Sequence, residues 1–292
     1  MVGVGYPNAW FDCFTNTTLY PDRPAGRMHA SLARVVVNGS DAAVLLGGLG
    51  AGNSVLDDAW LLVFDSVNLD TSFWPTCGWK RLTVAGDMPL AMDAVPLAHV
   101  PPGHLFLRHD LIMFGGCEGG IVSQQWRTRC LKKSNAVVAA DLDANTLKLT
   151  FTHLFSAGTA LPNVSLSQLI VSHDAVHILG GFTVNGTARG PRTAQSMMMP
   201  TAWRATAMVN STLQWEELSL PEFYGQPSAV WDEENQAILL AGVLFATSTT
   251  KVWWELVGAA RSFVDGARGL DISVFQAQQW IRVSAFRNSW RP

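Results

Sequence analysis

Three apolar segments of this chain each run directly into a pair of glycines, and the pairs recur along the chain at a nearly constant distance. The segments read AAVLLGG, LIMFGG and AVHILGG, and their second glycines are Gly48, Gly116 and Gly181. A fourth segment, QAILLAG, ends at Gly242 and has alanine in the first glycine position. The interval is about 60 to 70 residues, and self-similarity at a long fixed period indicates a repeat architecture.

An aromatic residue follows each glycine pair by roughly 30 to 40 residues, in a short segment of mixed polarity. It is Trp79, Trp215 or Trp280, and Phe151 takes its place in the second copy. One copy therefore predicts four strands: an apolar strand, a hairpin partner ending at the glycines, a third strand, and an outer strand carrying the aromatic residue. Four-stranded units repeated around an axis form a β-propeller.

The pattern places these strands at definite positions. The first two copies are expected at 28–37, 42–46, 59–64 and 78–83, and at 95–100, 111–114, 135–142 and 146–154. The last two are expected at 166–171, 175–179, 204–209 and 212–218, and at 228–232, 237–240, 270–276 and 279–283.

The first copy carries a specific order of residues: proline, Arg-x-His, double glycine, Asp-x-Trp, Phe-Asp and Trp-x-x-Leu. This order resembles the kelch repeat family, and later copies keep it with falling fidelity. The resemblance implies an all-β, kelch-type β-propeller of four-stranded blades and says little about function, because one fold hosts many activities. The residues that carry it are Pro24, Arg27, His29, Gly47, Gly48, Asp57, Asp58, Ala59, Trp60, Phe64, Asp65, Trp79, Leu82, Gly86 and Pro89.

We expect a single domain over 1–292, with repeats at about 24–89, 90–160, 161–220 and 221–288. The segment around Trp10 resembles one more outer strand, so residues 1–20 are interpreted as an extra strand beyond four full repeats. An unpaired outer strand exposes an edge. The alternative is that the chain is part of a larger ring.

The connections between second and third strands are long, and in kelch-type rings such loops contact partners on one face. Long loops on a rigid scaffold often carry binding function. Arginine binds carboxylates in a bidentate manner, which suits a protein partner with an acidic segment, whereas tryptophan can stack on RNA bases. Solvated loops with no partner are the simpler alternative. The candidate residues are Trp126, Arg127, Arg129, Lys132, Lys133, Arg189, Arg192, Lys251, Trp253 and Trp254.

No catalytic machinery is expected in this chain. It contains no GxSxG, P-loop or HExxH motif. Its only tyrosines are Tyr6, Tyr20 and Tyr224, none of them in a setting like that of the copper-radical kelch-type oxidases. We therefore expect a scaffold without cofactor or metal. The alternatives are a kelch domain of a larger enzyme, such as a leucine carboxyl methyltransferase-like enzyme that modifies tRNA, and a secreted sugar-active propeller.

The composition indicates a soluble, cytoplasmic protein with no membrane partner. The net charge is −3, and no apolar run approaches the ~20 residues of a membrane span. The first residues lack the basic and apolar regions of a secretory signal. Cysteines without a CxxC pair are interpreted as buried free thiols. Disulfides and a secreted protein are the alternative, because five N-x-S/T sequons fall in expected turns or loops: Asn16, Asn38, Asn163, Asn185 and Asn210.

Overall fold

The computed structural model describes residues 22–64, 77–88, 95–121, 130–165, 167–184, 196–198, 201–219, 228–232, 237–242, 252–253, 271–276 and 279–284. Within these residues the regular structure is β-strand, except for one short 3-10 turn, η1 (Ala51–Asn53). The all-β class expected from the repeat is confirmed. The expected extra strand at residues 1–20 lies outside the described residues.

Four units of four antiparallel strands follow one another along the chain. Unit 1 is β1 (Ser31–Val37), β2 (Ser40–Leu46), β3 (Ala59–Phe64) and β4 (Cys77–Gly86), and unit 2 is β5 (Leu97–His99), β6 (Leu111–Phe114), β9 (Val137–Asp143) and β10 (Lys148–Gly158). Unit 3 is β12 (Gln168–Val171), β13 (Val176–Leu179), β16 (Thr201–Val209) and β17 (Thr212–Ser219). Unit 4 is β18 (Ser228–Asp232), β19 (Ala237–Gly242), β21 (Asp271–Gln276) and β22 (Gln279–Ser284).

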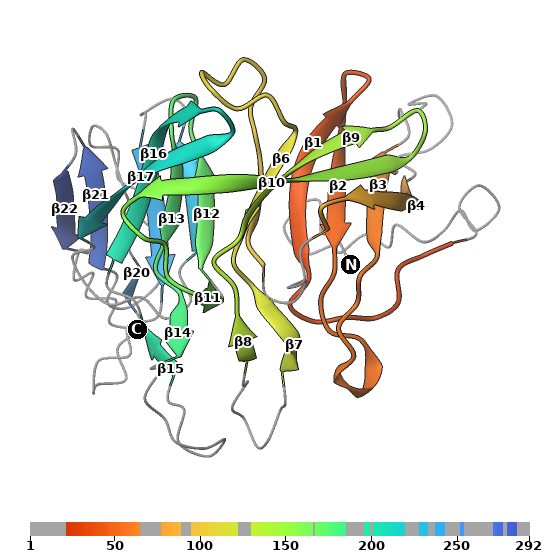
Figure 1. The fold of residues 1–292 in the computed structure, drawn as a ribbon, viewed down its shortest axis with the longest axis horizontal. Coiled ribbons are helices and arrows are strands. Elements are labelled where there is room, and N and C mark those ends of the chain that lie inside the picture. The colour runs from red at the N-terminus through yellow and green to blue at the C-terminus, as the bar shows by residue number, and fades with distance from the viewer. Residues whose placement is uncertain are drawn as a thin grey trace, which may run out of the picture.

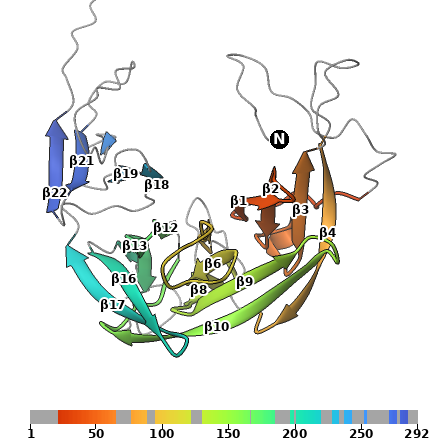
Figure 2. The same ribbon diagram turned by 90° about the horizontal axis from the view of Figure 1, so that it is seen from above.

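The units fan along an arc with their first strands innermost and their last strands outermost (Figures 1 and 2). β1 contacts β5, β5 contacts β12, and β12 contacts β18, so consecutive first strands are neighbours. Each unit is a meander, because within every unit the strands pair in sequence order. The strand positions predicted from the glycine pairs are therefore confirmed to within a few residues.

A joint that sequence reasoning missed connects the outer strands of neighbouring units. The end of β4 pairs in parallel with the start of β10, and the end of β10 pairs in the same way with the start of β17. Gly86 lies against Phe151 in the first joint, and Gly158 lies against Trp215 in the second. Both glycines have a left-handed φ, +81° and +84°, and a Cβ atom on either would overlap the opposing carbonyl oxygen. The same local geometry is thus used twice.

Apolar cores fill the spaces between neighbouring units. Successive side chains of a strand point to opposite faces, and β6 shows the result. Leu111 and Met113 join the core shared with unit 1, whereas Ile112 and Phe114 join the core shared with unit 3. Two aromatic residues of the outer strands lie in these cores, Phe151 in the first and Trp215 in the second. The third, Trp79 of β4, packs with Trp60 and Leu62 within unit 1 instead.

Candidate functional site

The long segments between the second and third strands are partly ordered as strands. We call them insertion 1 (residues 47–58), insertion 2 (115–136) and insertion 3 (180–200). Insertion 2 contains a hairpin of β7 (Cys117–Ile121) and β8 (Cys130–Lys133), and insertion 3 contains a hairpin of β14 (Phe182–Val184) and β15 (Ser196–Met198). Both hairpins project from the same end of the sheets (Figure 1). This end is the insertion face. The sequence predicts loops here, and the structure has hairpins.

Insertions 2 and 3 are fastened to each other through the backbone of one residue. Val164 lies in β11 (Val164–Ser165), which pairs with β14 of insertion 3. The Val164 amide donates to the carbonyl of Ser134 at 3.1 Å, and the amide of Gly116 donates to the Val164 carbonyl at 3.0 Å. The Val164 side chain is fully buried. The two hairpins therefore start from one hydrogen-bonded base that spans two units.

The glycine pairs form the beginning of each insertion. The second glycine of each pair, Gly48, Gly116 and Gly181, has φ between +97° and +99°. A Cβ atom on Gly48 would lie 2.7 Å from the carbonyl oxygen of Met28, because the segment entering unit 1 passes directly over it. Glycine is required here for both the left-handed turn and the close approach of another backbone.

Most of the predicted binding residues lie outside the described residues. These are Trp126, Arg127, Arg129, Arg189, Arg192, Lys251 and Trp254. Trp253 lies in β20 (Val252–Trp253), where it pairs with Ala241 of β19. Lys132 lies in β8 opposite Glu118 of β7. Lys132 is thus on insertion 2, and Trp253 lies in the connection between the second and third strands of unit 4.

Lys133 differs from the expectation of an exposed cation. Its side chain is only 7% exposed, and its backbone pairs with that of Cys117 in β7. Burial lowers the pKa of Lys133 from 10.5 to about 8, because the charged ammonium loses hydration. A run of basic residues in a sequence does not show which of them the fold covers. Lys133 belongs to the base of the hairpin rather than to its exposed surface.

Insertion 1 is fastened by charged side chains instead. The Arg27 guanidinium donates to Asp58 Oδ1 at 2.5 Å and Oδ2 at 2.8 Å, and to the Gly47 carbonyl at 2.9 Å. Trp60 Nε1 donates to Asp58 Oδ2 at 2.7 Å. Burial raises the pKa of Asp58, but the hydrogen bonds from Arg27 and Trp60 outweigh it and hold that pKa below its ordinary value. The kelch-like Arg and Asp-x-Trp residues therefore close one loop.

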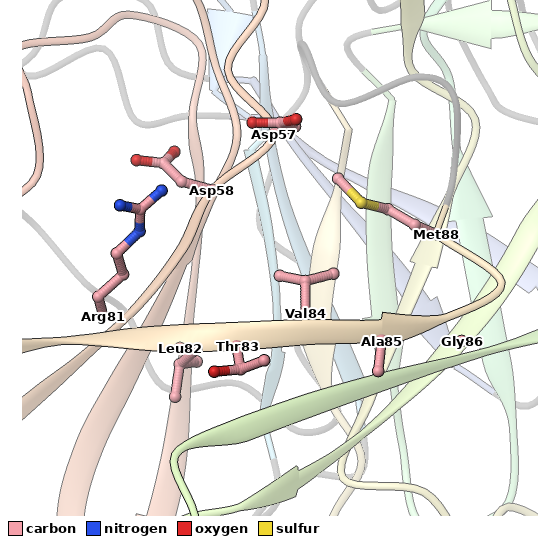
Figure 3. Close-up of a pocket in the computed structure, with 9 residues that line it drawn as sticks. All are labelled: Asp57, Asp58, Arg81, Leu82, Thr83, Val84, Ala85, Gly86 and Met88. Carbon is pink, nitrogen blue, oxygen red and sulfur yellow. The ribbon is translucent and has the colours of Figure 1, made fainter.

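A cleft of about 640 Å³ lies beside this cluster (Figure 3). Asp57 and Asp58 line one side, and β4 from Arg81 to Gly86 lines the other together with Met88. Arg81 and Asp58 point toward one another, and the Arg81 guanidinium carbon lies 6.0 Å from the centre of the Trp60 ring. The cleft is open and its Asp58 carboxylate is already paired with Arg27.

Three of the described histidines have surroundings that the structure defines closely. His104 is buried, and its Nδ1 accepts the Leu107 amide at 3.2 Å. Burial lowers the pKa of His177 to about 4, so this side chain is neutral inside unit 3. His109 contacts the Asp141 carboxylate at 3.0 Å. Within the described residues no group of three or more His, Cys, Asp or Glu side chains is arranged to hold a metal ion.

The interpretation of the cysteines as free thiols is wrong for two of them. Cys77 in β4 and Cys117 in β7 are both disulfide-bonded. Their burial is as expected, because they are 3% and 0% exposed. A sequence without paired spacing cannot show which cysteines the fold brings together.

Comparison with known proteins supports the fold. No family model matches the chain, and no curated protein matches it. A chain of the cryo-EM structure of RAG in complex with one melted RSS and one unmelted RSS is similar, with a TM-score of 0.54 and 13% identity over 92% of this chain and 68% of that one. The structure of YjhT is similar at a TM-score of 0.44 and 12% identity, over 74% of this chain and 58% of that one. At 13% identity the likeness to the RAG chain concerns the fold alone.

A search of the described part of the chain for a helix long and apolar enough to cross a membrane finds none.

Proposed function

We propose that this chain is a kelch-type β-propeller, or a large part of one, that binds a protein partner with an acidic segment through its insertion face. The four meanders in an arc, with first strands as neighbours, are the arrangement from which propeller blades are built. The kelch-like residue order of unit 1 supports the family assignment. The fold alone does not supply the function, which rests on the insertions.

The observation that carries the binding role is the common base of insertions 2 and 3. Two neighbouring units each extend a hairpin from one face, and the Val164 backbone holds the hairpins together. A rigid base that supports two long connections is typical of binding surfaces. Those connections carry arginines in the sequence, two in each: Arg127, Arg129, Arg189 and Arg192.

An acidic peptide fits this composition better than a catalytic substrate. Arginine pairs bind carboxylates through parallel hydrogen bonds. The described residues hold no group of three or more His, Cys, Asp or Glu side chains arranged for a metal ion. In this proposal the partner is recognised by charge and shape, in the manner of a scaffold.

Charge reversal tests this function. We expect the wild-type chain to bind a fluorescein-labelled glutamate-rich peptide and the R127E/R129E variant to lose at least tenfold in affinity, with an unchanged thermal melt. The matched control is K80E/K148E, which makes the same change in net charge at exposed positions of the outer strands β4 and β10. Equal binding by R127E/R129E and wild type would contradict the proposal.

RNA is the competing ligand, and the same assay separates it. An oligouridine of equal charge should bind more weakly than the peptide if arginine–carboxylate pairing decides affinity. Tight RNA binding that falls steeply with salt, as counterion release requires, would replace the acidic-peptide assignment by an RNA-binding one.

A further inference from the structure

The disulfide-bonded cysteines point to the compartment in which this protein matures. Cys77 and Cys117 lie in different units, and neither is a free thiol. Disulfides form and persist in oxidising compartments and are rare in the cytosol. Their formation removes two protons and two electrons from each pair of thiols and passes them to an oxidised thiol–disulfide oxidoreductase. The structure thus favours the secretory alternative over the cytoplasmic one.

Two sequons occupy hairpin turns with their acceptor asparagines in the open. Asn38 lies in the turn between β1 and β2, and Asn210 lies in the turn between β16 and β17. Both are exposed, with φ of +51° and +48°. Ser40 and Thr212, the hydroxyl residues of the two sequons, are the first residues of the following strands. An oligosaccharide on either asparagine would extend from a turn into solvent without displacing a strand.

Exposed apolar side chains gather beside these two asparagines. Val36, two residues before Asn38, is 49% exposed. Val209, the neighbour of Asn210, is 57% exposed, and Phe155 is 62% exposed. Phe155 pairs with Thr212 at the joint between β10 and β17, so it borders the same turn. The apolar face of a sugar ring attached to Asn210 would cover Val209 and Phe155.

We propose that this protein passes through the secretory pathway and carries N-linked oligosaccharides on Asn38 and Asn210. The donor is a lipid-linked diphosphate oligosaccharide. The side-chain amide nitrogen attacks the anomeric carbon of the first N-acetylhexosamine. The new N–C bond replaces the C–O bond to the diphosphate, which leaves with the lipid, and the amide proton passes to a base of the transferase. The modification does not depend on the proposed binding function.

Two other exposed asparagines are not expected to carry an oligosaccharide, and one of them provides a control. Asn163 is a sequon residue and exposed, but it precedes the fully buried Val164 and the buried Ser165 at the base of the hairpins, so we leave it out of the proposal. Asn145 lies in the turn between β9 and β10, which corresponds to the turn of Asn210. It is exposed, and it lacks a sequon because Leu147 stands in the third position.

Peptide mapping of the protein purified from its own source tests the proposal. An N-glycan amidase in heavy-oxygen water converts a glycosylated asparagine to labelled aspartate. We expect the label at Asn38 and Asn210 and none at Asn145, and we expect Cys77 and Cys117 to be alkylated only after reduction. Unlabelled peptides at both sequons would overturn the glycan assignment. Alkylation of either cysteine without reduction would overturn the assignment of the protein to the secretory pathway.

Sequon variants of the chain secreted from cultured eukaryotic cells test the sites without altering the asparagines. S40A and T212A should each remove the mass of one oligosaccharide, and T146A, the matched change beside Asn145, should leave the mass unchanged. An S40A or T212A protein that keeps the full mass would overturn the assignment of that site. Circular dichroism of each secreted variant separates loss of a glycan from loss of the fold.

Discussion

Insertions 1 and 2 start from the same glycine pair and are fastened by different means. In both, the first glycine amide donates to the residue before the third strand, from Gly47 to Asp58 at 3.0 Å and from Gly115 to Ala136 at 2.9 Å. Insertion 1 is then closed by the Arg27–Asp58 ion pair within its own unit. Insertion 2 is closed by backbone bonds to Val164, which belongs to the next unit.

The two insertions differ in whether charged side chains are paired at the base of the insertion. In insertion 1 the arginine and aspartate satisfy each other, so this short loop has little left to offer a partner. In insertion 2 the described base consists of backbone hydrogen bonds and apolar surface, together with the buried Lys133 and the disulfide-bonded Cys117. This contrast is the reason to assign binding to insertions 2 and 3, and the following changes test it.

Removal of Asp58 should have the largest effect. The Arg27 side chain is 5% exposed, and the D58A variant leaves its charge buried without this carboxylate. Loss of one member of a buried pair costs about 3–5 kcal/mol, so urea denaturation should show a decrease in the free energy of unfolding of that size. The matched control is D41A. Its Arg34–Asp41 pair has the same 2.5 Å distance but side chains 72% and 62% exposed, and its loss should cost at most about 1 kcal/mol. Similar losses in both variants would show that insertion 1 does not depend on the buried pair.

Lys133 should give the next largest effect, visible as a pH dependence. The folded pKa is about 8 and the ordinary value is 10.5. Between these values the unfolded chain binds the proton and the folded chain does not, so stability rises as pH increases through this window. The total rise is bounded by about 3 kcal/mol.

Chemical denaturation at about pH 7.5 and about pH 10 would measure the rise in the free energy of unfolding, because these two settings lie close to the two ends of the window. The K133M variant should lose this part of the pH dependence, and K80M, at an exposed position of β4, should keep it. A K133M profile equal to that of the wild type would show that Lys133 titrates normally and that the base of insertion 2 is open to water.

The strands were predictable because their signals are local. Apolar segments, turn residues and glycine pairs within a few residues of one another define each meander, and the structure has strands at those positions. The hairpins of the insertions were not predictable in this way. β7 reads CEGGI, which shows neither alternation nor β-branched residues until its end. Its pairing with β8 depends on the tertiary base beneath it.

The contacts that hold the insertions join residues far apart in the sequence, so a local sequence pattern cannot predict them. Arg27 and Asp58 are 31 residues apart, and their separate positions in the kelch-like order do not show that they pair. Burial of Lys133 and oxidation of Cys117 depend in the same way on what the fold packs around them. The sequence could therefore indicate which face carries long insertions and could not show which of their charges remain exposed.

Alanine substitutions of Gly115 and Gly52 should have the smallest effect on stability, and they test directly whether Val164 holds insertion 2. Both have a left-handed φ, +68° and +71°. Alanine in this conformation costs about 1–2 kcal/mol at either position. A Cβ on Gly115 would also lie 2.7 Å from the Val164 carbonyl oxygen, whereas no atom lies within 4 Å of one on Gly52 in insertion 1.

The G115A variant should therefore lose about 1 kcal/mol or more beyond the loss in G52A, because a backbone contact cannot move aside as a side chain can. Hydrogen exchange adds a local measurement. The Gly116 amide, which donates to Val164, should exchange faster in G115A and not in G52A. Equal stability losses in the two variants, with unchanged exchange of the Gly116 amide, would mean that Val164 does not join insertions 2 and 3. The proposed binding face would then have no common base.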